Sequence, residues 1–365
     1  MDRHDVSRRL SILLPILGVV VMALAWGRSP SVPVALLLAA LHVAVVLVAV
    51  GHAEAIAHRV GEPFGTLVLA LAVTVVEVAL IVTLMVSEGD KAATLARDTV
   101  FAAIMIVCNG VVGVSLLLNA RRTRTVRFSE QGANALLGTL MTLAALSLVM
   151  PSFTSSTRGP TFSPSQLAFS AVAATVLYGV FVFVQTVGFR WMFLCPTDDG
   201  AELPESDHER LPPERGGLWL RVVMLLVSLG AVIGLAKVLA PSIEDAVVWA
   251  GAPQSFVGVI IALLVLLPES LAAFRVASRG QMQTSINLAL GSALASIGLT
   301  IPAIAIASIW LDGPITLGLG PKEIVLLAVT AVVSILTFGS GRATVLQATH
   351  HLTVFAAFIF LSWEP

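Results

Sequence analysis

The sequence predicts an all-α polytopic membrane protein with eleven transmembrane helices, arranged as two inverted five-helix repeats and one extra N-terminal helix. Three observations lead to this fold class. The 365-residue chain is 57% hydrophobic and only 12% charged, whereas a soluble domain carries about 25% charged residues. The mean hydropathy is +0.95, and the apolar residues gather in long runs. Two of these runs each contain a glutamate at a matching place, Glu77 and Glu269.

The apolar runs are long enough to be membrane helices, which need about 20 mostly apolar residues. The predicted spans are residues 10–26, 32–50, 64–86, 98–118, 132–150, 166–189, 218–240, 254–276, 284–309, 321–338 and 346–362. The first run also resembles a signal peptide, because Arg8 and Arg9 precede it and Ala23-Leu24-Ala25 ends it. A retained helix agrees better with the distribution of charge.

Basic residues alternate between the loops of these spans. The N-terminus and every second loop after it hold fifteen of the 21 lysines and arginines, including Arg121, Arg122, Arg124 and Arg127 after the fourth span. Because basic loops stay in the cytoplasm, we expect the N-terminus in the cytoplasm and the C-terminus on the periplasmic or extracellular side. A multi-pass protein of a bacterial inner membrane fits this pattern.

One hydrophilic insertion divides the chain. We expect residues 1–31 to form the extra helix, 32–195 the first repeat (spans 2–6), 196–217 an acidic cytoplasmic loop, and 218–365 the second repeat (spans 7–11). The loop carries seven acids among prolines and glycines. It is either a solvated linker or a weak sensor of divalent cations, since carboxylates suit calcium.

Two acids lie deep inside predicted spans. A charged side chain at mid-bilayer costs at least about 2.5 to 3.5 kcal/mol, so such residues are functional candidates. Glu77 lies in the third span and Glu269 in the eighth, and neither mid-span contains a lysine or arginine. A protonated glutamic acid hydrogen-bonded between helices is the alternative. Five spans separate the two acids, so their helices cross the membrane in opposite directions, as in inverted-repeat transporters.

Polar residues accompany each acid. Thr74 shares the helical face of Glu77, and Gly258 and Ala262 share the face of Glu269. The spans that follow contain Asn109 in the first half and Ser292 and Ser296 in the second. These side chains are either cation and proton ligands or simple packing residues. We predict a cation- and proton-binding site of Glu77, Glu269, Thr74, Asn109, Ser292 and Ser296, with the two glutamates as the metal ligands.

A carboxylate that binds either a cation or a proton, never both, couples the two flows. The sequence therefore predicts a secondary-active antiporter that exports calcium, sodium or potassium in exchange for protons. A cation channel or uniporter with the same acidic site is the alternative. No Walker A, Gly-x-Ser-x-Gly or His-Glu-x-x-His sequence occurs, so we expect no enzyme and no cofactor. The expected partners are these ions and the lipid bilayer, without nucleic acid, and the sequence leaves the oligomeric state open.

Particular segments resemble a known family. Gly61-Glu62-Pro63-Phe64-Gly65-Thr66-Leu67, running to Glu77, resembles the first alpha-repeat of ChaA-type bacterial antiporters, in the cation/proton exchanger branch of the calcium/cation antiporter superfamily. Pro268-Glu269-Ser270, Gly291-Ser292 and Thr300-Ile301-Pro302 continue the likeness in the second half, and it covers nearly the whole chain.

The resemblance implies eleven spans, an inner-membrane location and alternate binding of cation and proton by Glu77 and Glu269. One departure concerns selectivity. The wider family has Gly-Asn shortly before each glutamate, where this chain has Val73-Thr74 and Val265-Leu266. Two amide ligands are therefore missing, which leaves room for monovalent ions.

Several polar residues near the spans have two interpretations. Glu62 precedes Glu77 by about 22 Å along a helix, so it either collects ions at the cytoplasmic entrance or caps the third span. His42, His350 and His351 are more typical of interfacial or packed histidines than of ligands.

Overall fold

The computed structural model describes residues 3–28, 30–60, 74–75, 78–79, 81–82, 94–194, 217–310 and 315–364. Glu62, Glu77, most of the predicted third span and the acidic loop lie outside these residues. The described chain is helical apart from one two-stranded pairing, β1 (Val126–Arg127) with β2 (Arg342–Ala343), which run antiparallel. It separates into two compact units, residues 1–89 with 215–257 and residues 90–214 with 258–365. Each unit thus combines segments from both predicted repeats.

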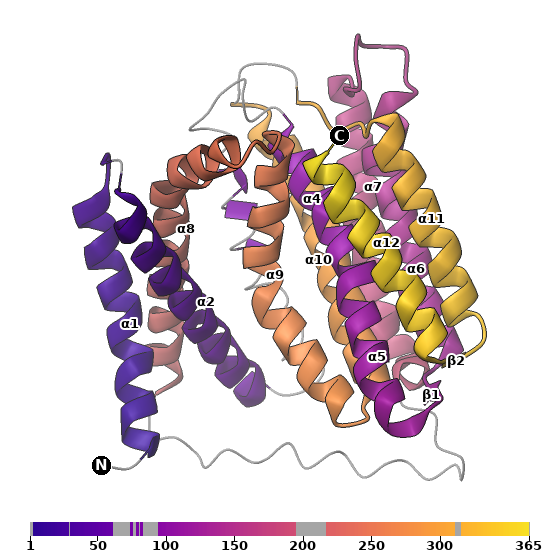
Figure 1. Ribbon diagram of the computed structural model, residues 1–365, viewed down its shortest axis with the longest axis horizontal. Coiled ribbons are helices and arrows are strands. Elements are labelled where there is room, and N and C mark those ends of the chain that lie inside the picture. The colour runs from indigo at the N-terminus through magenta and orange to yellow at the C-terminus, as the bar shows by residue number, and fades with distance from the viewer. Residues whose placement is uncertain are drawn as a thin grey trace. The chain divides into compact units, whose positions relative to one another are not determined.

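The first unit contains three long helices, drawn in indigo and brown in Figure 1. They are α1 (Arg3–Ala25), α2 (Val32–Val60) and α8 (Leu218–Trp249). Val45 of α2 and Ala231 of α8 are completely buried, and a β-carbon added to Gly18 of α1 would lie 3.1 Å from a side-chain atom of each. The missing side chain of Gly18 thus lets α1 approach both partners. His52 of α2 bonds the Ser11 carbonyl through Nε2 at 2.9 Å.

The second unit is a larger helical bundle (Figure 1). Its elements are α4 (Leu95–Met105), η2 (Ile106–Val111), α5 (Val112–Thr123), α6 (Glu130–Ala144), η3 (Ala145–Val149), η4 (Met150–Ser152), α7 (Pro164–Phe183), η5 (Val184–Gly188), η6 (Arg190–Phe193), α9 (Ser255–Ser278), α10 (Met282–Ala307), α11 (Pro321–Phe338) and α12 (Val345–Trp363). The continuous helix α4–η2–α5 is almost entirely buried. The helix can be buried over this length because no charged side chain, which would need contact with water, lies between Asp98 and Arg121.

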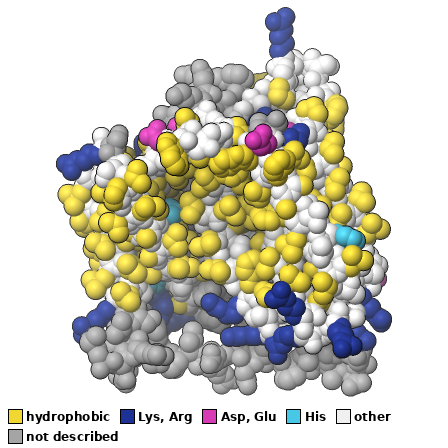
Figure 2. All heavy atoms as spheres, viewed as in Figure 1, with side chains coloured by type: hydrophobic (Ala, Val, Ile, Leu, Met, Phe, Trp, Pro, Cys, Tyr) yellow, Lys and Arg dark blue, Asp and Glu magenta, His cyan; other side chains and the backbone are white. Residues whose placement is uncertain are grey.

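Basic side chains gather at one end of the second unit, as the lower right of Figure 2 shows. The end of α5 carries Arg121 and Arg122, and the β1–β2 pairing carries Arg127 opposite Arg342. Hydrophobic side chains cover the region above (Figure 2). The pairing brings two loops that the charge count assigns to the cytoplasm to the same end of this unit.

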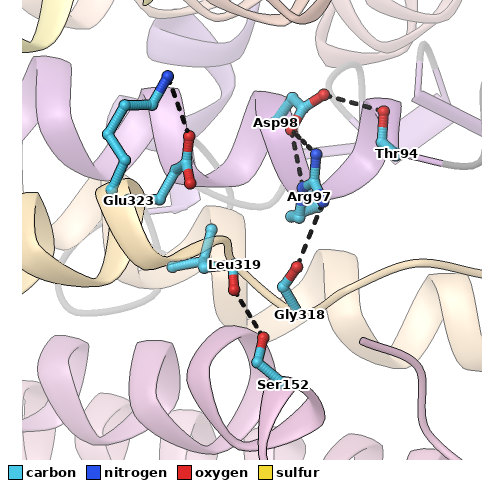
Figure 3. Close-up of polar contacts among 8 residues, drawn as sticks. Thr94, Arg97, Asp98, Ser152, Gly318, Leu319 and Glu323 are labelled. Atoms are coloured by element: carbon cyan, nitrogen blue, oxygen red, sulfur yellow. Dashed lines mark hydrogen bonds and ion pairs between the residues drawn. The ribbon is translucent and has the colours of Figure 1, made fainter. Parts of the chain in front are cut away.

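At the opposite end of the unit, side chains form an ion pair and hydrogen bonds to backbone carbonyls (Figure 3). Arg97 on α4 pairs with Asp98 at 2.8 Å and donates to the Gly318 carbonyl at 3.3 Å. Ser152 donates to the neighbouring Leu319 carbonyl at 2.6 Å. The segment that leads into α11 is thus held by two different helices.

Each predicted span except the third corresponds to a described helix at nearly the predicted position. Eight helices of the described residues are long and apolar enough to cross a membrane, and α9, bent by 54° at Pro268, makes a ninth if both parts count as one span. Residues 9–25 of α1 form a shorter apolar helix. The chain is therefore a multi-pass helical membrane protein, and the count of eleven stays a prediction.

Candidate cation- and proton-binding site

Glu269 lies on α9, and contacts at both ends of α9 fix this helix against α4–η2–α5. Near the start of α9, a β-carbon added to Gly258 would lie 2.9 Å from Asp98 Cβ and 3.1 Å from the Thr99 backbone nitrogen. Near its end, Asn119 Nδ2 donates to the Ala277 carbonyl at 3.3 Å. The two helices are therefore in contact at both ends and run in the same direction.

These two contacts set the depth of Glu269. The residue lies slightly more than half-way from Gly258 to Ala277. The corresponding point on the neighbouring helix, between Asp98 and Asn119, falls in η2, beside Asn109. Glu269 is half-buried there. A carboxylate is thus held at mid-span, level with an irregular helical turn.

The helix that carries Glu269 is bent at the preceding residue. Its two parts, Ser255–Leu267 and Glu269–Ser278, meet at 54°. Pro268 has no N–H, so the Leu264 carbonyl loses its helical hydrogen-bond donor. A freed carbonyl one turn from a carboxylate is an oxygen ligand of the kind that hard cations take.

Ser292 reaches the same depth from α10. Ser285 donates to Ser115 of α5 at 3.0 Å, which fixes the two helices relative to one another. Ser292 lies seven residues, about 10 Å, beyond Ser285 on α10. The two helices run in opposite directions, so the residue at the same level on the neighbouring helix is Cys108, seven residues before Ser115. Ser292 is half-buried and Ser296, one turn beyond, is 2% exposed. Glu269, Asn109 and Ser292 therefore lie at one level of the second unit.

Asn109 makes its contacts on the side of α11. It is fully buried, and its Nδ2 donates to Thr330 Oγ1 at 2.9 Å. Among the described residues its Oδ1 has no hydrogen-bond partner. The residue lies in η2, a π-helical turn in which the Val112 N–H donates to the Val107 carbonyl. Such turns are frequent at functional sites, and this one was not predicted from the sequence.

Of the other predicted site residues, the structure describes Thr74 but neither Glu77 nor Glu62. Thr74 is 3% exposed and lies in the first unit. Glu77 and Glu62 lie outside the described residues, so the pairing of the two glutamates stays a prediction. Within the described part of the chain, no group of three or more His, Cys, Asp or Glu is placed to hold a metal ion.

Sequence reasoning missed the buried hydroxyl groups of α11, of which Thr330 contacts Asn109. Thr330, Ser334 and Thr337 of α11 are all buried, and so is His351 of α12, which the sequence predicts to be packed or interfacial. Their spacing of four and three residues along 321–338 is a helical stripe, and this stripe was the available signal.

The end of α9 offers a test of how the Glu269 helix is held. Asn119→Ala would leave the Ala277 carbonyl without its side-chain donor, at a cost of roughly 1 kcal/mol. We expect a lower melting temperature of the purified protein and slower exchange. Asn134→Ala on α6 is the control, since Asn134 makes no side-chain hydrogen bond to the described residues. Equal melting temperatures of the two variants would show that the contact does not hold α9.

Known proteins resemble this chain over almost its whole length. The sodium/calcium exchanger protein family model matches residues 30–187 and 220–364. The chain belongs to this family. It is 44% identical over 360 residues to the y4hA protein of Sinorhizobium fredii, covering 97% of this chain and 96% of that one. It is 35% identical over 356 residues to the sodium-potassium/proton antiporter ChaA of Escherichia coli, covering 96% and 95%.

Solved structures share the fold of this family member. The H⁺/Ca²⁺ exchanger CAX superposes with a TM-score of 0.70 at 16% identity, covering 99% of this chain and 94% of that one. These matches confirm the predicted membership of the ChaA-type group and the calcium/cation antiporter superfamily. The family is one of transporters rather than enzymes, as expected.

Proposed function

We propose that this chain is a secondary-active cation/proton antiporter of a bacterial inner membrane. The observation that carries the proposal is the mid-span carboxylate of Glu269, beside the bend at Pro268 and level with η2. The printed name of the Escherichia coli relative, a sodium-potassium/proton antiporter of 35% identity, supports it. The basic end of the second unit then faces the cytoplasm, and the N-terminus is cytoplasmic.

In this proposal Glu269 and Glu77 bind a cation and protons in turn. A carboxylate attracts a cation only while it is ionised, so protonation releases the ion and ion binding releases the proton. Ser292, Ser296, Thr74 and Asn109 contribute neutral oxygens to the ion. Glu62 collects ions at the cytoplasmic entrance. Eleven spans in two inverted repeats give each carboxylate access from opposite sides in alternation.

The transported ion includes sodium or potassium as well as calcium. Val265 and Leu266 occupy the positions where the wider family has Gly-Asn, and both are buried. Apolar side chains cannot replace the amide oxygen ligands that a divalent cation favours. Fewer oxygen ligands favour a weaker, less calcium-selective site.

Everted membrane vesicles test the function. Vesicles with the protein are acidified by respiration, and a fluorescent pH probe reports proton release on addition of calcium, sodium or potassium. We expect at least one of these ions to release protons, and vesicles without the protein to show no response. Uptake of a radioactive cation without proton movement would contradict antiport and favour the channel or uniporter.

A further inference from the structure

One buried face of α11 is polar. Thr330, Ser334 and Thr337 follow one another at four and three residues, and their exposed fractions are 0%, 0% and 1%. Residues at this spacing share one side of a helix. Hydroxyl groups in an apolar interior are unfavourable unless they are hydrogen-bonded, so this face requires polar partners.

Both ends of the face have such a partner. Thr330 Oγ1 accepts from Asn109 Nδ2 at 2.9 Å. Thr337 Oγ1 lies 3.1 Å from His351 Nε2. The helix α12 that carries His351 also packs against η2, since a β-carbon added to Gly110 would lie 3.3 Å from the Phe355 ring. Polar groups of η2, α11 and α12 therefore surround a common region.

Three buried atoms in this region lack a hydrogen-bond partner among the described residues. They are Ser334 Oγ, Asn109 Oδ1 and His351 Nδ1. Ser334 stands one helical turn from Thr330 and one from Thr337, so its hydroxyl lies between the two hydrogen bonds. Buried polar groups of this kind are commonly bridged by internal water.

The surroundings of His351 are closed and uncharged. The imidazole is fully buried, and the Phe338 ring lies 6.3 Å from it. Gly113 provides the room, because a β-carbon there would lie 3.2 Å from His351 Cβ. The nearest titratable groups are His350 on the same helix and Cys108 on η2, while the facing residues of α11 and α5 are neutral.

We propose that Asn109, Ser334 and His351 enclose bound water that, together with the imidazole, forms a proton-binding station beside the candidate cation site. Water fits this region better than a divalent ion does, because no carboxylate among the described residues belongs to it. The imidazole takes a proton from this water at Nδ1 and later returns it to water from the same atom, while Nε2 keeps its hydrogen bond to Thr337 Oγ1. This inference rests on the proposed antiport and adds a residue through which protons pass.

His351→Gln tests the station in the vesicle assay. Glutamine keeps a hydrogen-bonding group but cannot carry a proton. We expect the maximal exchange rate to fall about tenfold or more, with an altered pH profile and an unchanged cation concentration for half-maximal exchange. His350→Gln is the matched control, because His350 is exposed on the same helix.

The Ser334→Ala variant tests whether the region holds bound water or is empty. The Ser334 hydroxyl has no described protein partner, so its removal breaks no hydrogen bond within the described part of the chain. If water binds there, exchange slows and the solvent deuterium isotope effect changes. If exchange and isotope effect match the unmutated protein, the station is wrong.

Two further outcomes complete the test. The proposal would also be overturned if the His351→Gln variant had the exchange rate and pH profile of the unmutated protein. If that variant fails to fold, Ser334→Ala decides, because it removes one atom only. If the unmutated protein itself shows no cation-induced proton release, the proposed antiport is contradicted.

Discussion

Replacing Glu269 by glutamine should abolish cation-induced proton release in everted vesicles, for every ion that the unmutated protein exchanges. Glutamine has the same shape as glutamate but neither binds a proton at neutral pH nor carries a charge. Glu269 lies on the bent helix α9, level with η2, and the variant leaves no ionisable group at this position. We expect the signal to equal that of vesicles without the protein, at unchanged protein amount.

Two further variants are needed to interpret this result. Glu130→Gln, which removes an exposed carboxylate at the start of α6, should leave exchange intact. Glu77→Gln should abolish it as completely as Glu269→Gln, because the proposal assigns both glutamates to one site. Normal exchange by the Glu269 variant would remove that residue from the site. Normal exchange by the Glu77 variant alone would refute the two-glutamate mechanism.

Gly258→Ala should inactivate the protein although it adds a single methyl group. The new β-carbon would lie 2.9 Å from Asp98 Cβ and 3.1 Å from the backbone of Asp98 and Thr99. Backbone cannot move aside as a flexible side chain can, and such overpacking costs roughly 1 to 3 kcal/mol. The contact also sets the position of α9 along α4. A shift of α9 moves Glu269 away from the level of η2, so exchange falls with stability.

Gly138→Ala on α6 is the matched control for this change. Apart from its chain neighbours and the backbone of its own helix, no described atom lies within 4 Å of a β-carbon at Gly138, and alanine is favoured over glycine within a helix by about 1 kcal/mol. We therefore expect the two substitutions to change the melting temperature in opposite directions. A Gly258→Ala variant that melts at or above the unmutated protein and exchanges normally would refute the close α4–α9 contact.

The helices of this protein were predictable, because their positions depend on local composition. An apolar run of membrane length has to form a helix that satisfies its own backbone, and basic residues mark its cytoplasmic ends. Both signals are read along the chain without knowledge of any partner. The same reasoning singled out Glu269, since an acid within an apolar run is costly wherever the helix packs.

The contacts of the site were not predictable in this way. Asn109 and Thr330 are 221 residues apart in the chain, and no period in either helix indicates that they meet. The turn η2 was also missed, because a π-helical turn keeps the composition of the helix around it. The hydroxyl stripe of α11 was visible as a spacing, but only its burial against η2 and α12 shows that it needs partners.

The amino-acid sequence was thus sufficient to establish a multi-pass helical membrane protein, its family resemblance and Glu269 as an acid inside a span. Each of these follows from the cost of placing polar or charged groups in lipid, which every residue bears regardless of its neighbours. The packing of the folded chain was needed to bring Glu269 level with Ser292, to turn Asn109 toward α11, and to enclose His351. These features depend on which helices touch, and interhelical contacts arise from side-chain shape and hydrogen bonding between segments distant in the chain.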